Sequence, residues 1–131
     1  MTKNEITVSN GELVSVIEEQ GIDQIIKPLV TEIHLFDTYI AGTSYLKNKE
    51  PLKTVQVGDT LILQREDNRF DDMAIVILDS EHRKLGYVPE KDNIVFSRLM
   101  DAGKRLTAKV NTIKDLDYFV KISISIYLVD Y

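Results

Sequence analysis

The chain has 131 residues, of which 44% are hydrophobic and 28% are charged, and this composition is typical of one globular domain and not of a disordered chain. It has no cysteine, which excludes disulfides, thiolate metal sites and a cysteine nucleophile. Its net charge of −5 argues against a uniformly basic nucleic-acid surface.

The acidic charge is concentrated near the N-terminus. Residues 1–33 hold two basic and six acidic residues, whereas the rest of the chain holds 14 basic and 15 acidic residues. The nearly neutral body can therefore still hold a local basic groove. The N-terminal sequence lacks the basic and apolar regions of a secretory signal, and no apolar run is long enough to cross a membrane. We therefore expect a soluble, cytoplasmic protein with no membrane partner.

Residues 1–32 are expected to form an N-terminal helical extension. Ser9 or Asn10 is a suitable N-cap for an amphipathic helix that Gly21 would end. A second, short helical turn is expected before Pro28. This extension would either pack on the rest of the domain or present its apolar face to a partner.

The second expected domain, residues 33–131, is mainly β. Apolar and polar residues alternate with the period of a strand in several short segments, most regularly in the last one. The expected strands span residues 32–42, 60–64, 73–78, 84–88, 105–113 and 120–128. A lysine-rich loop is expected over 43–53, and one helix over 94–102. Many short strands, mostly antiparallel, predict a small barrel or sandwich.

The connection between the second and third expected strands is unusually polar. Residues 65–72 comprise six charged residues, one amide and one aromatic residue. A hairpin connection needs only about two to five residues. The segment is therefore either a solvated acidic loop or a loop with a function beyond turning the chain.

Motifs for catalysis or metal binding are scarce. His34 and His82 have no partner at a metal-binding spacing, and the sequence has no GxSxG, Walker A or GxGxxG motif. Asp67, Asp71 and Asp72 are the one acidic cluster that could hold Mg²⁺ or Ca²⁺ in a metal-dependent hydrolase, but their spacing is not that of an EF-hand. We expect no cofactor, no metal and no enzymatic activity.

Three motifs in the β part together resemble those of the HIRAN domain. They are the strand end DTYIAG at residues 37–42, the segment LILQREDNRFDDMAI at 61–75, and the strand end LGYVP at 85–89. The resemblance covers about residues 33–130 and leaves the N-terminal extension outside it. It implies a mainly β, OB-like barrel of about six strands with one or two short helices.

The same resemblance implies a binding module and not an enzyme. HIRAN domains are found with DNA-translocating ATPases, with nucleases and as stand-alone proteins. In a eukaryotic remodeller the domain captures the free 3′-OH end of single-stranded DNA and helps to regress stalled replication forks. For this chain, which is expected to be a stand-alone version, the resemblance implies recognition of single-stranded DNA 3′-OH ends in DNA repair or replication-fork processing.

The resemblance also implies particular DNA-contacting residues. Tyr39 and Phe70 occupy the positions of aromatic residues that stack on terminal bases; the alternative is that one of them, more readily Phe70, belongs to the core. Asp71 matches an acid near the terminal hydroxyl, because a carboxylate accepts a hydrogen bond from a 3′-OH and repels a phosphate. Thr38 stands where the eukaryotic motif tends to have a basic residue, which weakens the expected grip on phosphate.

Five further residues complete the expected DNA-binding set. Arg65 and Asn68 are expected to donate to a phosphate or a base edge, with a surface ion pair to a neighbouring acid as the alternative for Arg65. Tyr87 and Lys91 flank the second strand end. Tyr118, or the residue after it, would approach from the last hairpin.

A protein-interaction adaptor is the alternative function. The barrel would then be a scaffold, and the acidic extension of residues 1–32 would recruit a separately encoded helicase or nuclease.

Overall fold

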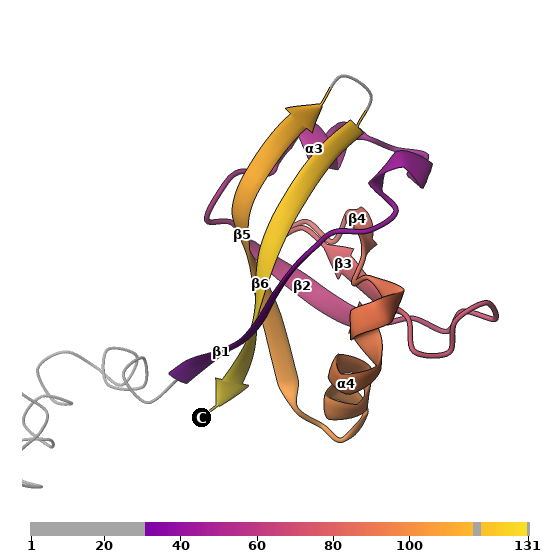
Figure 1. Cartoon of the computed structure of the whole chain (residues 1–131), viewed down its shortest axis with the longest axis vertical. Helices are drawn as coiled ribbons and strands as arrows, with labels where there is room; N and C mark the ends of the chain where they lie inside the picture. Colours follow the sequence, from indigo (N-terminus) through magenta and orange to yellow (C-terminus); the bar gives the residue numbers. More distant parts are fainter. Residues whose placement is uncertain (1–30, 117–118, 131) are drawn as a thin grey trace, which may run out of the picture. The chain divides into compact units, whose positions relative to one another are not determined.

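The computed structural model describes residues 31–116 and 119–130 (Figure 1). Within these residues the chain forms one six-stranded sheet with the order β1-β6-β5-β2-β3-β4. The strands are β1 (Thr31–Tyr39), β2 (Thr60–Arg65), β3 (Ile75–Leu78), β4 (Lys84–Tyr87), β5 (Arg105–Leu116) and β6 (Phe119–Asp130). The helices are α3 (Glu50–Thr54) and α4 (Glu90–Asp101), and η2 (Thr43–Tyr45) is a single 3₁₀ turn. The expected N-terminal helices and Tyr118 lie outside the described residues.

The sheet is built from antiparallel neighbours and curls strongly. β2 pairs with β3 and with β5, and β3 pairs with β4. β5 and β6 form a long hairpin that is paired from Arg105 opposite Val129 to Leu116 opposite Phe119. Figure 1 shows this hairpin crossing the direction of β2, so that the sheet bends into a half-barrel. The expectation of a mainly β, OB-like barrel with short helices is confirmed.

The two edges of the curled sheet meet just after β1. The Ile40 amide donates to the Ile122 carbonyl of β6 at 2.9 Å. The next residue, Ala41, donates to the Tyr87 carbonyl of β4 at 2.8 Å and accepts from the Tyr87 amide at 2.9 Å. The segment Ile40–Ala41 therefore joins β6 to β4. We call this the closure segment.

The closure segment requires a glycine on the opposing strand. A Cβ atom at Gly86 would lie 2.3 Å from the Ala41 carbonyl oxygen and 2.6 Å from the Ile40 Cγ2 atom. Gly86 also has a φ of +154°, which side-chain-bearing residues rarely adopt. The glycine of the LGYVP motif therefore permits the close backbone approach that closes the sheet.

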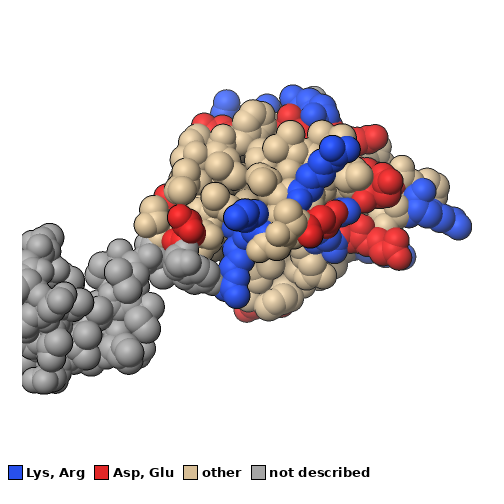
Figure 2. Space-filling view, turned by 90° about the horizontal axis from the view of Figure 1, so that it is seen from below, with Lys and Arg blue, Asp and Glu red and all other residues tan. Residues whose placement is uncertain are grey.

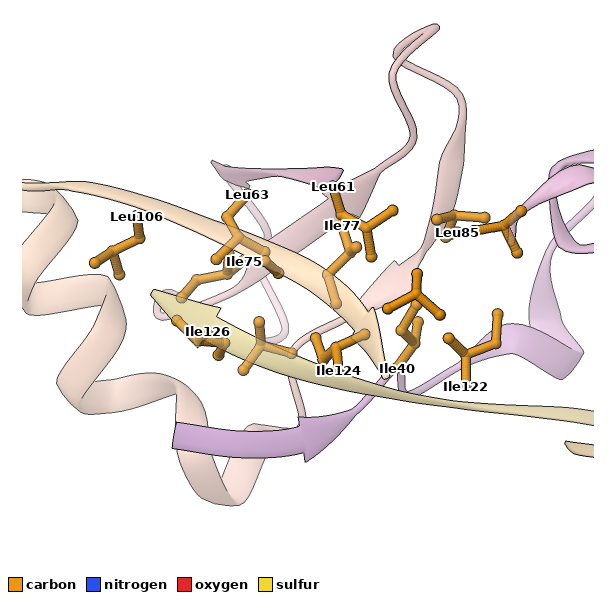
Figure 3. Packing of buried hydrophobic residues seen from close by; sticks show 14 of the residues in the cluster. Ile40, Leu61, Leu63, Ile75, Ile77, Leu85, Leu106, Ile122, Ile124 and Ile126 are labelled. Carbon is orange, nitrogen blue, oxygen red and sulfur yellow. The ribbon is translucent and has the colours of Figure 1, made fainter. Parts of the chain in front are cut away.

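One hydrophobic core fills the concave side of the sheet. Figure 3 shows Ile40 of the closure segment beside Ile122 and Ile124 of β6, so the closure segment is itself part of this core. Beyond the closure segment, the buried core residues come from β2 to β6, both helices and the loops that flank them: Leu52, Val55, Leu61, Leu63, Ile75, Ile77, Leu85, Val88, Phe96, Leu106, Ala108, Val110, Ile122, Ile124 and Ile126.

A polar contact on the other side of the sheet ties β1 to β6. Asp37 accepts hydrogen bonds from the buried Ser125 hydroxyl and from the His34 ring, each at 2.6 Å. The bond from Ser125, followed by the bond from His34, lowers the pKa of Asp37 below its ordinary value. His34 is thus an exposed surface residue that helps to position β1.

The segment 43–53, which was expected to be a loop, contains a helix instead. The Glu50 amide donates to the Asn48 side chain at 3.1 Å, and Pro51 follows in the first turn of α3. Proline is well tolerated there, because the first helical amides need no partner within the helix. The prediction was wrong because it treated Pro51 only as a break.

Two element starts also differ from the prediction. α4 begins at Glu90, four residues before the expected start, because Pro89 precedes it and accepts from the Asp92 amide at 2.9 Å. β3 begins at Ile75 and not at residue 73, because the Met73 amide is turned toward the Asp71 side chain. Neither described helix is long and apolar enough to span a membrane.

Replacement of Gly86 by alanine tests the closure. We expect Gly86→Ala to lower the free energy of unfolding by about 3 kcal/mol or more, since the new Cβ collides with backbone as well as adopting an unfavourable φ. Gly58→Ala is the matched control: Gly58 has a φ of +91° but no atom within 4 Å of the added Cβ. Its loss should be about 1 kcal/mol. Urea unfolding measures both, and equal losses would contradict the steric argument.

Candidate nucleic-acid interface

A hollow of about 220 Å³ lies where the sheet closes. We call it the closure hollow. Four parts of the chain line it: Ala41 of the closure segment with the residue after it, the loop between β2 and β3, β4 with the residue after it, and the start of α4. The lining residues are Ala41, Gly42, Asn68, Asp71, Ala74, Tyr87, Val88 and Glu90. Three of the residues expected from the sequence, Asn68, Asp71 and Tyr87, are thus brought together here.

The Asp71 carboxylate is held in place by two hydrogen bonds. Its Oδ1 atom accepts from the Met73 amide at 2.9 Å, and its Oδ2 atom accepts from Asn93 Nδ2 at 2.8 Å. Asn93 belongs to α4 and is only 3% exposed. A carboxylate oxygen can accept two hydrogen bonds, so each oxygen of Asp71 retains capacity for a donor in the hollow.

Asn93 is a site residue that sequence reasoning missed. The helix was expected to begin at residue 94, but Asn93 lies inside α4 and its amide donates to Asp71. The available signal was its spacing: Asn93 lies three residues before Phe96 and four before Ser97, on the buried face of α4, and a buried amide needs a polar partner.

The wall formed by Tyr87 is also fixed by polar contacts. The Tyr87 hydroxyl donates to Glu66 Oε1 at 2.6 Å and accepts from Lys84 Nζ at 2.7 Å. Lys84 Nζ lies 4.3 Å from the centroid of the same ring. Asn68 donates to Glu66 at 3.3 Å and accepts from the Phe70 amide at 2.8 Å, which shapes the loop.

A second cluster lies close in the chain to the closure hollow. Tyr39 is 36% exposed, and its ring centroid lies 5.6 Å from Lys91 Nζ and 5.7 Å from Lys121 Nζ. Tyr39 lies two residues before Ala41, and Lys91 directly follows Glu90, so both are close in the chain to residues that line the hollow. We call Tyr39, Lys91 and Lys121 the Tyr39 cluster. It combines an exposed aromatic face with two cations.

Lys121 is a second residue that was missed. The alternation along β6 placed it on the outward face, but nothing in the sequence indicated that β1 would bring Tyr39 next to it. Thr38, in contrast, is directed to α4, where its hydroxyl donates to Asp92 at 2.9 Å. It therefore positions the start of α4, which includes Lys91.

Arg65 has partners within the fold. Its Nε atom donates to Asp101 at 2.9 Å, and its Nη1 and Nη2 atoms donate to the carbonyls of Ala74 at 2.6 Å and Asp72 at 2.8 Å. These contacts link the loop between β2 and β3 to the end of α4. The ion pair is made with Asp101 and not with the neighbouring acids. A phosphate contact by Arg65 stays a prediction, and we leave it out of the proposed interface.

Phe70 lies at the surface and not in the core. Its side chain is 85% exposed, and the Arg69 guanidinium carbon lies 5.2 Å from the ring centroid. The loop that contains it projects from the sheet at the right of Figure 1. Of the described aromatic residues, Tyr87 alone lines the closure hollow; Tyr39 and Phe70 do not share it.

The charged side chains are mixed. Figure 2 shows Lys and Arg side chains separated by acidic and uncharged ones on the face in view. Binding through non-specific phosphate contacts is therefore expected to be weak and sensitive to salt. The described residues contain no group of three or more His, Cys, Asp or Glu side chains arranged to hold a metal ion.

Comparison with protein families gives a clear result. A model of the HIRAN domain matches residues 33–129. The chain belongs to the HIRAN domain family. This family is known as a nucleic-acid-binding module, which agrees with the expectation drawn from the three motifs.

Two solved structures are similar to this HIRAN domain. A protein from Lactobacillus plantarum is 28% identical, with a TM-score of 0.72 over 78% of this chain and 99% of that one. The HIRAN domain of human HLTF is 16% identical, with a TM-score of 0.62 over 76% of this chain and 78% of that one, and this likeness shows the fold alone. A search of curated proteins found no match.

The contacts of Arg65 predict a loss of stability when they are removed. We expect Arg65→Gln to lower the free energy of unfolding by about 2 kcal/mol, because it removes charge-assisted bonds that fix the loop between β2 and β3. Arg69→Gln, in the same loop with the same change of charge, should change it by less than about 0.5 kcal/mol. Urea unfolding compares the two; equal effects would show that Arg65 does not cross-link the loop.

Proposed function

We propose that this HIRAN domain binds the 3′-hydroxyl end of single-stranded DNA, in DNA repair or replication-fork processing. The proposal depends on one observation: a carboxylate, that of Asp71, is fixed in the closure hollow with capacity to accept a further hydrogen bond.

The acidic lining of the hollow supports recognition of a strand end and not binding of an internal part of the strand. Glu90 also lines it, and Glu66 lies directly behind Tyr87. Carboxylates repel phosphates but accept hydrogen bonds from hydroxyl groups. In a DNA strand the terminal sugar presents such a hydroxyl at the 3′ end. The group recognised in the hollow is therefore a terminal 3′-OH.

The size of the hollow supports the same conclusion. At about 220 Å³ it is smaller than a typical small-molecule site of about 300–1,000 Å³. It can receive a terminal sugar, whereas a longer piece of the strand must lie outside it. The volume of the hollow therefore suits the end of a DNA strand.

The Tyr39 cluster supports binding of the nucleotides next to the end. A base can stack on the exposed Tyr39 ring whatever its identity, and the ammonium groups of Lys91 and Lys121 are donors for phosphates. Phe70, at the projecting loop, offers a second aromatic face. This division assigns the hydroxyl to Asp71, and the base and phosphates to the Tyr39 cluster.

The direct test compares short single strands that end in a 3′-OH or a 3′-phosphate. We expect the 3′-OH strand to bind at least about tenfold more tightly, since the phosphate replaces a hydrogen-bond donor by a like charge beside Asp71. Fluorescence anisotropy at low salt measures both affinities. Asp71→Asn should reduce this ratio, because a neutral amide no longer repels the terminal phosphate.

Asp67→Asn is the control, because it makes the same change of charge in the same loop without touching the hollow. It should leave the ratio unchanged. Equal affinity of the wild-type protein for both strands would reject the role of Asp71. No binding of either strand at low salt would reject DNA as the ligand.

Tyr39 is expected to contribute through its ring. Tyr39→Ala should weaken binding by about 1–3 kcal/mol, which is the usual contribution of stacking on one base. Tyr39→Phe should bind nearly as well as the wild-type protein, because the ring is retained. If the phenylalanine variant loses as much affinity as the alanine variant, the hydroxyl and not the ring is the group that matters.

The adaptor function, in which the barrel is a scaffold and the acidic extension recruits a helicase or nuclease, stays a prediction. It concerns residues 1–32, most of which lie outside the described residues.

A further inference from the structure

A second, larger hollow lies next to the closure hollow. Its volume is about 400 Å³, and its lining includes Tyr45, Lys47, Arg83 and Lys84. Among the described residues that line it, every charged side chain is basic. We call it the basic hollow. It differs in sign from the closure hollow, which is lined by Asp71 and Glu90.

Two short pieces of chain connect the hollows. Gly42 lines the closure hollow and Tyr45 lines the basic hollow. The turn η2 joins these two residues, and the Tyr45 amide donates to the Gly42 carbonyl at 3.1 Å. On β4, Tyr87 lines the first and Lys84 the second, and their side chains meet at 2.7 Å. The contact between Lys84 and Tyr87 therefore links the linings of the two hollows.

Tyr45 is placed for contact with a ligand. It is 89% exposed, so its ring makes almost no contribution to the core. The turn that presents it starts at Gly42, whose φ of 77° is in the left-handed region that favours glycine. An aromatic ring held out on a tight turn beside lysines has the chemistry of a stacking platform for a base.

The cations of the basic hollow are not equivalent. Arg83 is paired with Asp79 at 2.9 Å and with Glu81 at 3.1 Å, so its charge is largely compensated. Among the described residues neither Lys47 nor Lys84 forms a salt bridge; the Lys84 ammonium donates to the Tyr87 hydroxyl, which in turn donates to Glu66. Lys47 and Lys84 are therefore the groups that can neutralise phosphates.

We infer that the DNA strand, with its 3′ end in the closure hollow and its terminal nucleotide at the Tyr39 cluster, continues past Lys84 into the basic hollow, where a base stacks on Tyr45 and a phosphate contacts Lys47. The assignment of the 3′ end rests on the proposed function. The change of sign fixes the direction: the acidic hollow takes the terminal hydroxyl, and the basic hollow takes internal phosphates on the 5′ side.

The test is a length series of oligothymidylates with 3′-OH ends, from the dinucleotide to the decanucleotide. Wild-type affinity should rise once the strand is long enough to reach the basic hollow. Tyr45→Ala should lower the affinity for the longer strands about fivefold or more and leave the dinucleotide unchanged. Tyr45→Phe should bind like the wild-type protein at every length.

The salt dependence isolates the phosphate contact. For the longer strands, Lys47→Gln should reduce the slope of log affinity against log salt by about 0.7, the contribution of one phosphate contact to a single strand. Lys104→Gln, which removes an exposed lysine from the turn after α4, should leave the slope unchanged. Equal effects of the two lysine variants would reject the contact with Lys47.

The outcomes separate this inference from the proposed function. If 3′-OH strands are preferred but affinity does not rise with length and Tyr45→Ala has no effect, the path through the basic hollow is rejected and end binding stands. If 3′-OH and 3′-phosphate strands bind equally while the Tyr45 effect persists, end recognition is rejected, and with it the direction of the strand.

Discussion

The backbone pairing between Ala41 and Tyr87 is the contact on which the site depends. It joins the chain after β1 to β4 and so closes a sheet that would otherwise have two separate edges. The approach is close enough that only glycine is accommodated at position 86. Because Ala41 and Tyr87 also line the closure hollow, the contact that completes the fold is the same contact that forms the wall of the proposed binding site.

The distribution of charge explains how an acidic chain can belong to a nucleic-acid-binding family. A net charge of −5 would be unfavourable for a protein that grips DNA along its length. A protein that binds the 3′ end of a DNA strand needs only a few cations near an acceptor for the terminal hydroxyl. In the binding mode proposed above, the acceptor is Asp71 and the cations are those of the Tyr39 cluster and the basic hollow, so that local contacts and not the overall field would determine binding.

Much of the fold could be predicted, because strand alternation and the three motifs are local patterns. The contacts that define the site could not be predicted in the same way. Arg65 pairs with Asp101, 36 residues later, and Asp71 pairs with Asn93, 22 residues later. No local pattern reveals such partners, since they depend on how α4 packs against the loop between β2 and β3. The sequence also did not determine whether Phe70 is exposed, because a phenylalanine at this position is compatible with a core residue and with a residue that stacks on a base.

The most direct measurement is a crystal structure of the domain with a short single strand that ends in a 3′-OH. The account predicts the terminal 3′ oxygen in the closure hollow, within about 2.5–3.0 Å of an Asp71 carboxylate oxygen, with the chain leaving toward Lys84 and Tyr45. A structure with the 3′ end outside the hollow, or with an internal phosphate beside Asp71, would contradict it.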